Sequence, residues 1–378
     1  MFLLGLALPL VYIPAVTGFM ILSGWVLLSL VLPWMLLRRI EMGRAHWLGL
    51  AFLAYASISL LWTPVLVQGV WKLWLLWILA FSFCVSAAGY RLDRLLLGAA
   101  MGLGVNLAVA LAQAFGWHFL PQTSGAPSGL FVNANPFGEV AALTSIGLLT
   151  TRQFWPLTLT LPCIWLSDSR TALLALGVAG GVWLWDKLRW RGLVLALALA
   201  LPLGAIGWWH KPSTSSLLER EAIWLDTVDG LSPFGRGAGS FLILYPHFAT
   251  RTDTMATRPE SAHNDFLELI FEFGIGTIPL FGLVAIALFT RGPWRYLWWA
   301  FCAVALVAFP TAIPVEGFLG MVALGALCRG WRVAWIERAR LRPAIWPWAG
   351  GRSSSAIPLE PLHPHSAGLL RDPSWRAS

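Results

Sequence analysis

Long apolar runs, separated by shorter polar stretches, extend along most of the chain. Twelve runs can be drawn, at residues 2–14, 17–37, 46–62, 68–88, 95–117, 136–151, 155–167, 171–186, 192–209, 266–290, 296–310 and 315–328. A helix that crosses a bilayer needs roughly 20 apolar residues, so several runs are short and the one at 155–167 is the weakest. The pattern predicts an all-α integral membrane protein with about twelve transmembrane helices.

The basic residues indicate how these helices cross. With a cytoplasmic N-terminus and twelve crossings, the inner side receives most arginines and lysines of the short connections: Arg38, Arg39, Arg44, Arg91, Arg94, Arg152, Lys187, Arg189, Arg191, Arg291 and Arg295. Such an excess is typical of cytoplasmic loops. If 155–167 did not cross, the basic hairpins at 187–191 and 291–295 would lie outside. The charges therefore favour twelve crossings.

The longest polar region on the predicted outer side, 210–265, is too long to be only a connection. Its segment SLLEREAIWLDTVDGL predicts an amphipathic helix that lies along the membrane surface. The apolar face of that helix comprises Leu218, Ile223, Trp224, Leu225 and Val228. We expect a transmembrane domain at 1–342 and a disordered cytoplasmic tail at 343–378, which is rich in proline, serine and arginine.

Composition supports a membrane location. Hydrophobic residues make up 58% of the chain and charged residues 12%, too apolar a mixture for one water-soluble globule. The N-terminal stretch MFLLGLALPL has no preceding basic residue and no convincing cleavage site, so we expect a retained span and no removable signal peptide. The net charge of +8 follows from the loop arginines, and we expect no nucleic-acid partner.

Several classes of site are not expected. The four cysteines fall inside or at the edge of apolar runs without metal-ligand spacing, so zinc and disulfides are not predicted. The chain has no Asp-x-Asp pair, no Walker loop and no Gly-x-Ser-x-Gly motif, and we expect neither metal nor cofactor. Gly235, Gly237 and Gly239 predict a tight turn with positive φ, or else a backbone that approaches a phosphate.

Two arginines lie near apolar surface on the predicted outer side. Arg170 stands at the start of a helix, and Arg220 is on the amphipathic helix. Guanidinium groups there suit bidentate contact with phosphate oxygens. The alternative is that both extend to the membrane interface or pair with neighbouring carboxylates. Three further arginines are interpreted as solvated loop charges: Arg236, Arg251 and Arg258.

One histidine, His263, lies where the polar loop meets the apolar run at 266–290. Ser261 or Asn264 can cap a helix that begins there, and in that interpretation the histidine has no chemical role. A neutral imidazole is nevertheless well suited to accept a proton from a sugar hydroxyl near neutral pH. Glu268 and Glu272 are spaced i, i+4 just inside the span, where carboxylates are costly enough to indicate partners or function, such as orienting an arginine.

These residues carry a family resemblance. SDSRTALLAL, EREAIW followed by SPFGRGAGSF, and AHNDFLELIFEFGIGTIPLFG resemble the signature region of the O-antigen ligase and polymerase superfamily. GLFVNANPFGE, which contains Asn135 and Glu139, is similar to another segment of that group. The resemblance spans roughly residues 129–290. The superfamily consists of bacterial membrane enzymes that act on undecaprenyl-diphosphate-linked glycans.

The resemblance implies an inverting, metal-independent glycosyl transfer. It makes His263 the base that activates the acceptor hydroxyl, and it assigns Arg170 and Arg220 to the donor diphosphate. Five further residues are candidates for substrate contact or orientation: Asn135, Glu139, Asn264, Glu268 and Glu272. It also implies a multi-pass protein of the inner membrane whose active site faces the periplasm, with membrane lipids around it.

The acceptor distinguishes the members of the superfamily. A ligase passes the glycan to lipid A-core in lipopolysaccharide biosynthesis, a polymerase to another lipid-linked glycan, and an O-oligosaccharyltransferase to a protein. We favour the ligase slightly. A flippase for the same lipid-linked sugars is the alternative from another class, but it predicts charged residues through the bilayer midplane, whereas Lys72, Glu139, Glu268, Glu272 and Glu316 lie near the outer ends of their spans.

Overall fold

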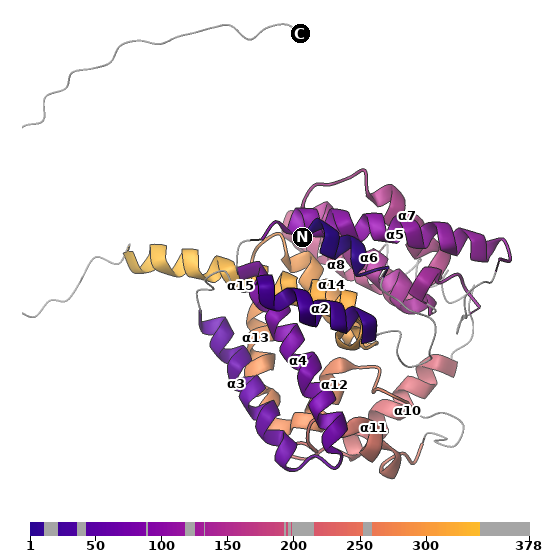
Figure 1. The fold of residues 1–378 in the computed structure, drawn as a ribbon. Coiled ribbons are helices and arrows are strands. Elements are labelled where there is room, and N and C mark those ends of the chain that lie inside the picture. The colour runs from indigo at the N-terminus through magenta and orange to yellow at the C-terminus, as the bar shows by residue number, and fades with distance from the viewer. Residues whose placement is uncertain are drawn as a thin grey trace, which may run out of the picture. The chain divides into compact units, whose positions relative to one another are not determined.

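The computed structural model describes residues 1–10, 22–35, 43–87, 90–117, 125–131, 133–192, 194–195, 198, 215–251 and 259–340. All regular secondary structure in these residues is helical, which confirms the predicted all-α class for them (Figure 1). The chain divides into two units, Met1–Ile336 and Glu337–Ser378. The first unit carries the candidate site. The predicted tail at 343–378 lies outside the described residues.

The helices follow the apolar runs closely. Before the long polar region they are α1 (Phe2–Ala7), α2 (Leu22–Met35), α3 (Arg44–Ile58) with the 3₁₀ turn η1 (Ser59–Leu61), α4 (Leu66–Ala87), α5 (Leu92–Ala114), η2 (Gly129–Phe131), α6 (Ala134–Thr150), α7 (Leu157–Ser167) and α8 (Arg170–Leu188). After it they are α10 (Ser215–Asp229), α11 (Phe241–Leu244), η3 (Tyr245–His247), α12 (Asp265–Phe273), η4 (Gly274–Thr277), α13 (Ile278–Phe289), α14 (Arg295–Ala305), η5 (Pro310–Ala312) and α15 (Pro314–Arg340).

Five helical segments among the described residues are long and apolar enough to cross a membrane: Arg44–Leu61, Leu66–Ser86, Leu92–Ala114, Arg170–Leu188 and Asp265–Phe289. Helices α2 and α7 are apolar but shorter. The predicted run at 192–209 falls almost wholly outside the described residues. These helices are those of a multi-pass membrane protein, while the number of twelve crossings stays a prediction.

Helix α6 lies at the centre of one packing group. It contacts α5, α7, α8 and α14, and every residue from Pro136 to Leu148 is buried. Small residues allow this close packing: a Cβ on Gly138 would lie 2.3 Å from the Oγ of Ser167 on α7. A helix buried on all sides carries its polar side chains into the protein interior, and α6 carries Glu139 there.

The apolar run predicted as one helix at 266–290 is broken in the structure. Helix α12 ends at Phe273, η4 follows, and α13 begins at Ile278. The break occurs because the glycine-rich segment packs against it: Ile275 N donates to the Pro233 carbonyl at 2.8 Å, and Gly274 adopts φ +48°. A Cβ on Gly274 would meet the Pro233 carbonyl oxygen at 2.2 Å. Continuous hydrophobicity therefore gave the wrong prediction of an unbroken helix.

The predicted amphipathic helix in the long polar region forms as α10, which packs against α12. Its predicted apolar face divides in two. Ile223 is buried in the protein with Phe241, Tyr245 and Phe271. Leu218, Leu225 and Val228 are exposed, whereas Asp226 and Thr227 are buried. The helix thus buries one apolar residue together with two polar ones, and leaves three residues of its predicted apolar face exposed. The expected membrane-surface location applies to the exposed apolar face and remains a prediction.

Candidate active site

His263 lies just before α12 in an unusual backbone conformation. Asn264 caps α12, since its Oδ1 accepts from Leu267 N at 3.1 Å. His263 has φ +50°, a left-handed conformation that costs a non-glycine residue about 1–2 kcal/mol. The other described non-glycine residues with positive φ, Arg152, Asp168 and Arg189, follow the ends of helices. The surroundings of His263 must therefore hold it in place.

The imidazole of His263 is half-buried. Its ring contacts that of Phe309, with the centroids 5.2 Å apart, and its Nδ1 is buried without a hydrogen-bond partner among the described residues. Burial, followed by the positive charge of Arg220, lowers the pKa of His263 to about 4, while Glu268 opposes this effect. The imidazole is consequently neutral at physiological pH and can accept a proton.

Arg220 is the cation next to this imidazole. It extends from α10, is partly buried, and donates through Nη1 to the Val307 carbonyl at 2.7 Å. Burial lowers the pKa of Arg220, against the opposing charges of Glu139 and Glu219. A guanidinium titrates so far above neutral pH that it stays charged. The predicted base and one predicted diphosphate ligand therefore lie within electrostatic reach of each other.

The connection between α14 and α15 forms one wall of this site. Val307 accepts from Arg220, and Phe309 packs on His263. Thr311 N donates to the buried Asp265 carboxylate at 2.9 Å. Sequence analysis missed this wall, because its residues are apolar or small and have no distinctive motif.

Glu139 links the two helices that carry the predicted diphosphate ligands. It is buried on α6, hydrogen-bonds the side chain of Thr171 on α8, and faces the charge of Arg220 on α10. Its carboxyl group also meets that of Glu316 on α15, whose oxygens receive no hydrogen bond from a donor in the described chain. Glu316 and Thr171 were not predicted.

Arg170 is the first residue of α8 and is exposed. Ser169 caps this helix by accepting from Ala172 N at 3.3 Å, and Arg170 precedes Thr171, the partner of Glu139. The backbone of Arg170 is therefore fixed one residue from the Glu139 contact. Glu139 thus connects the start of α8 with the side chain of Arg220, which itself faces His263.

A comparison with protein families agrees with this arrangement. Residues 155–282 match the family model described as O-antigen ligase. This part of the chain is therefore similar to the O-antigen ligase family. The matched stretch runs from the residues before α7 into α13 and includes Arg170, Arg220 and His263. No curated protein is similar enough to count as a match. The resemblance inferred from the sequence motifs is confirmed.

Within the matched stretch, Glu268 and Glu272 have a partner other than an arginine. The ammonium group of Lys72 on α4 lies 2.6 Å from Glu268 Oε1 and 3.3 Å from Glu272 Oε2. Each glutamate also accepts from a backbone N–H, Glu268 from Ala262 at 3.0 Å and Glu272 from Phe241 at 3.5 Å. In the described residues the two carboxylates thus contact a lysine, and the prediction that they orient an arginine is wrong.

The remaining polar candidates have simpler surroundings. Asn135 is exposed at the start of α6, and its backbone N donates to Asn133 Oδ1 at 2.9 Å. Asn133 is thereby the helix cap, and Asn135 is exposed near the start of the buried α6. Asn264, the cap of α12, uses its side-chain oxygen to accept from Leu267. Asn135 stays a candidate for substrate contact, and Asn264 holds the helix next to His263.

The glycine-rich segment is a structural turn. Gly235, Gly237 and Gly239 have φ of +74°, +96° and +66°, as the turn interpretation predicts. Consecutive backbone N–H groups are already bonded: Arg236 to the Phe271 carbonyl, Gly237 to that of Glu272, and Ala238 to Ser59 Oγ. The first two donors hold the turn on α12 and the third holds it on η1. None of the three is available to a phosphate, so the alternative interpretation is wrong for them.

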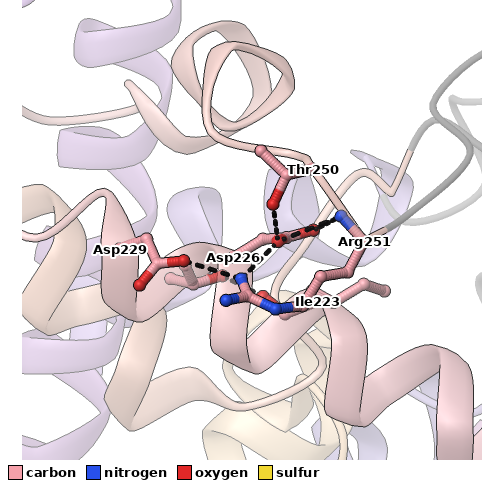
Figure 2. A network of polar contacts seen from close by, with 6 residues as sticks. Ile223, Asp226, Asp229, Thr250 and Arg251 are labelled. Atoms are coloured by element: carbon pink, nitrogen blue, oxygen red, sulfur yellow. Dashed lines mark hydrogen bonds and ion pairs between the residues drawn. The ribbon is translucent and has the colours of Figure 1, made fainter.

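Two of the loop arginines anchor α10 and its neighbours. Figure 2 shows Arg251 reaching both Asp226, at 2.8 Å, and Asp229, at 2.6 Å, while Thr250 also donates to Asp226. Arg236 donates to the Gly230 carbonyl at 3.0 Å and stacks on Phe248. The interpretation of Arg236 and Arg251 as merely solvated charges is wrong. Arg258 lies outside the described residues.

Proposed function

We propose that the protein is a glycosyltransferase that moves a glycan from an undecaprenyl-diphosphate carrier to an acceptor hydroxyl. The observation that carries this proposal is that the side chains of His263 and Arg220 both contact the connection between α14 and α15, at Phe309 and Val307. Such a pair places a base for the incoming oxygen next to a cation for the departing diphosphate. The similarity of residues 155–282 to the O-antigen ligase family supports the same reaction class.

In the proposed reaction, the acceptor oxygen attacks the anomeric carbon from the face opposite the diphosphate. Its proton passes to His263. The bond between the anomeric carbon and the phosphate oxygen breaks, and its electron pair leaves with the undecaprenyl diphosphate. Attack opposite the leaving group inverts the anomeric configuration. Arg220 and Arg170 stabilise the charge that develops on the diphosphate, a role that a metal ion has in many other transferases.

The proposed membrane arrangement has twelve crossings in the bacterial inner membrane with the site on the periplasmic face. The polyprenyl chain of the donor lies along the apolar helices, and α10 contacts the membrane surface through Leu218, Leu225 and Val228. This arrangement follows from the predicted outer position of the arginines and from the proposed polyprenyl-linked donor. We favour ligation to lipid A-core as the reaction that the protein carries out.

The test uses purified protein with undecaprenyl-diphosphate-linked oligosaccharide and excess EDTA, with and without lipid A-core. One discrete product on lipid A-core, unaffected by EDTA, supports the ligase. A ladder of products without lipid A-core means a polymerase, and transfer to a co-purified protein means an O-oligosaccharyltransferase. A reaction that EDTA abolishes contradicts metal-independent transfer.

His263→Ala separates an enzyme from a transporter of the same lipid. Loss of a general base lowers transfer by about 10²–10⁴-fold. A flippase has no proton to abstract from an acceptor, so its His263→Ala variant would still move the lipid-linked sugar across proteoliposomes. Translocation that persists in the variant, together with no transfer by the wild-type protein, would overturn the proposed function.

A further inference from the structure

A buried ion-pair cluster lies behind the base. Lys72, Glu268 and Glu272 have side chains that are 20%, 11% and 2% exposed. Lys72 is the one lysine within a predicted span, and it reaches from α4 to α12. One ammonium group between two carboxylates keeps both acceptor groups in place, because without it the two buried negative charges would repel each other.

The cluster reaches the histidine through the Ala262 backbone. Glu268 uses one oxygen for Lys72 and the other for Ala262 N, at 2.6 Å and 3.0 Å. The Ala262 carbonyl, on the other side of the same residue, accepts from Trp224 Nε1 at 2.9 Å. That carbonyl belongs to the peptide group that leads into His263. Both polar groups of Ala262 are therefore fixed, one by α12 and one by α10.

This double anchor accounts for the conformation of the base. His263 N makes a long contact of 3.4 Å to Ser261 Oγ, too weak to hold a left-handed residue by itself. Its φ of +50° persists only if the neighbouring peptide groups are constrained. Glu268 supplies one constraint, and the position of Glu268 depends in turn on Lys72.

We propose that Lys72 is a positioning residue for the transfer reaction, which fixes Glu268 on the Ala262 amide and thereby keeps His263 aligned with its acceptor. Lys72 contacts neither substrate nor His263 in this role. The proposal rests on the proposed function of His263 as the base. It deepens that function by naming the contacts that hold the base in position.

Glu268→Gln and Glu272→Gln form a matched pair for the test. Each removes one negative charge next to Lys72, but only Glu268 contacts Ala262. In Glu268→Gln the new amide has one acceptor oxygen for two donors, Lys72 and Ala262 N–H, so one donor loses its partner. We expect faster hydrogen–deuterium exchange in the peptide covering 259–265 and a fall in kcat of about 100-fold, as for a base displaced by about 1 Å. Glu272→Gln should change both far less.

Lys72 itself is tested by three variants. Lys72→Met should reproduce the faster exchange and lower kcat of Glu268→Gln, with the donor KM little changed, and Lys72→Arg should restore much of the loss. In Lys72→Met/Glu268→Gln, the oxygen of the introduced amide is free for Ala262 N–H, and its nitrogen can donate to Glu272. We expect this double variant to be more active than either single variant.

The outcomes separate this inference from the proposed function. Equal effects of Glu268→Gln and Glu272→Gln, or unchanged exchange over 259–265 in Lys72→Met, would overturn the positioning role. The double variant could also be inactive although its hydrogen–deuterium exchange over 259–265 matches that of the wild-type protein. That result would indicate that Lys72 contacts the substrate, and it would also overturn the positioning role. Full activity of His263→Ala would instead refute the proposed base, whereas the exchange results would still report on the contact between Lys72, Glu268 and Ala262.

Discussion

The chemistry at the residue scale depends on keeping one imidazole neutral. Burial of His263 and the charge of Arg220 both disfavour the imidazolium form, and their combined effect exceeds that of Glu268. In the proposed reaction the same guanidinium stabilises the leaving diphosphate. A single cation can thus serve both partners of the proposed reaction, because it keeps the base unprotonated and attracts the departing negative charge.

This coupling predicts a pH dependence. A base must be unprotonated, so kcat/KM should rise as the pH increases through about 4 and stay level across neutral pH. Arg220→Gln removes a charge that lowers the pKa of His263, so the acidic limb should move to higher pH. The donor KM should also increase. Rates measured from about pH 3.5 to 8 check this.

Arg291→Gln is the control for that experiment. Arg291 is exposed in the connection before α14, so its replacement changes the net charge equally without altering the surroundings of His263. Its acidic limb should coincide with that of the wild-type protein. An Arg220→Gln profile that also coincides would contradict electrostatic coupling between Arg220 and His263.

Residue types could be predicted at the site, but their partners could not. The sequence drew attention to His263, Arg170 and Arg220, because a histidine and arginines next to apolar surface are uncommon and occur in recognisable motifs. Lys72 and Glu316 contact the site only through tertiary packing, from α4 and α15. A buried i, i+4 pair of carboxylates needs a cation, and Lys72 is the lysine in an apolar run, so that signal was present in the sequence.

At the scale of elements, the break between α12 and α13 positions the site. The glycine-rich turn is bonded to the end of α12 through the carbonyls of Phe271 and Glu272. This contact brings the backbone N–H of Phe241 to the carboxylate of Glu272, which is one of the two carboxylates that contact Lys72. In a soluble protein, the periodicity of apolar residues shows which face of a helix is buried. A helix within a membrane is apolar on every face, so its sequence has no such periodicity. The break therefore leaves no trace in hydropathy, and the glycines alone indicate it.

Gly274→Ala should destabilise the protein. A Cβ at φ +48° would be strained and would meet the Pro233 carbonyl at 2.2 Å. We expect a loss of about 1–3 kcal/mol in the free energy of unfolding. Gly282→Ala in α13 is the matched control, because no atom lies within 4 Å of its added Cβ. Thermal unfolding in detergent should show a lower Tm for Gly274→Ala alone, and equal Tm values would contradict the packing described for the break.

The polar network on α10 predicts a second pair of variants. Asp226 is fully buried and accepts from Thr250 and from Arg251, whereas the side chain of Asp229 is 54% exposed. Asp226→Ala should cost about 2 kcal/mol or more, because it leaves several donors without a partner. Asp229→Ala should cost less than about 1 kcal/mol. Urea unfolding of the two variants checks the order, and a larger loss for Asp229→Ala would contradict the anchoring role of Asp226.

At the scale of the whole molecule, hydropathy predicted the class and most helix positions. Ten of the twelve predicted runs coincide broadly with described helical segments, counting α12 and α13 together; the run at 2–14 is described only to residue 10, and that at 192–209 falls almost wholly outside. The central place of α6 could not be predicted, since its small residues read as an ordinary apolar run. Only packing against α5, α7, α8 and α14 shows that it is buried on all sides. The direction in which each helix crosses the membrane was predicted from the loop charges, and a separate experiment tests it.

Labelling of single cysteines tests that direction. In a chain whose four native cysteines are replaced by alanine, Glu219→Cys on α10 should react in intact cells with a maleimide that enters the periplasm but does not cross the inner membrane. Arg291→Cys should react only after the inner membrane is permeabilised. Both positions are exposed, so accessibility within the protein does not limit the reaction. If α7 does not cross, every later segment is inverted, and Arg291→Cys would react in intact cells while Glu219→Cys would not. That result would place His263 on the cytoplasmic side, away from a periplasmic acceptor, and would contradict the proposed reaction at this face.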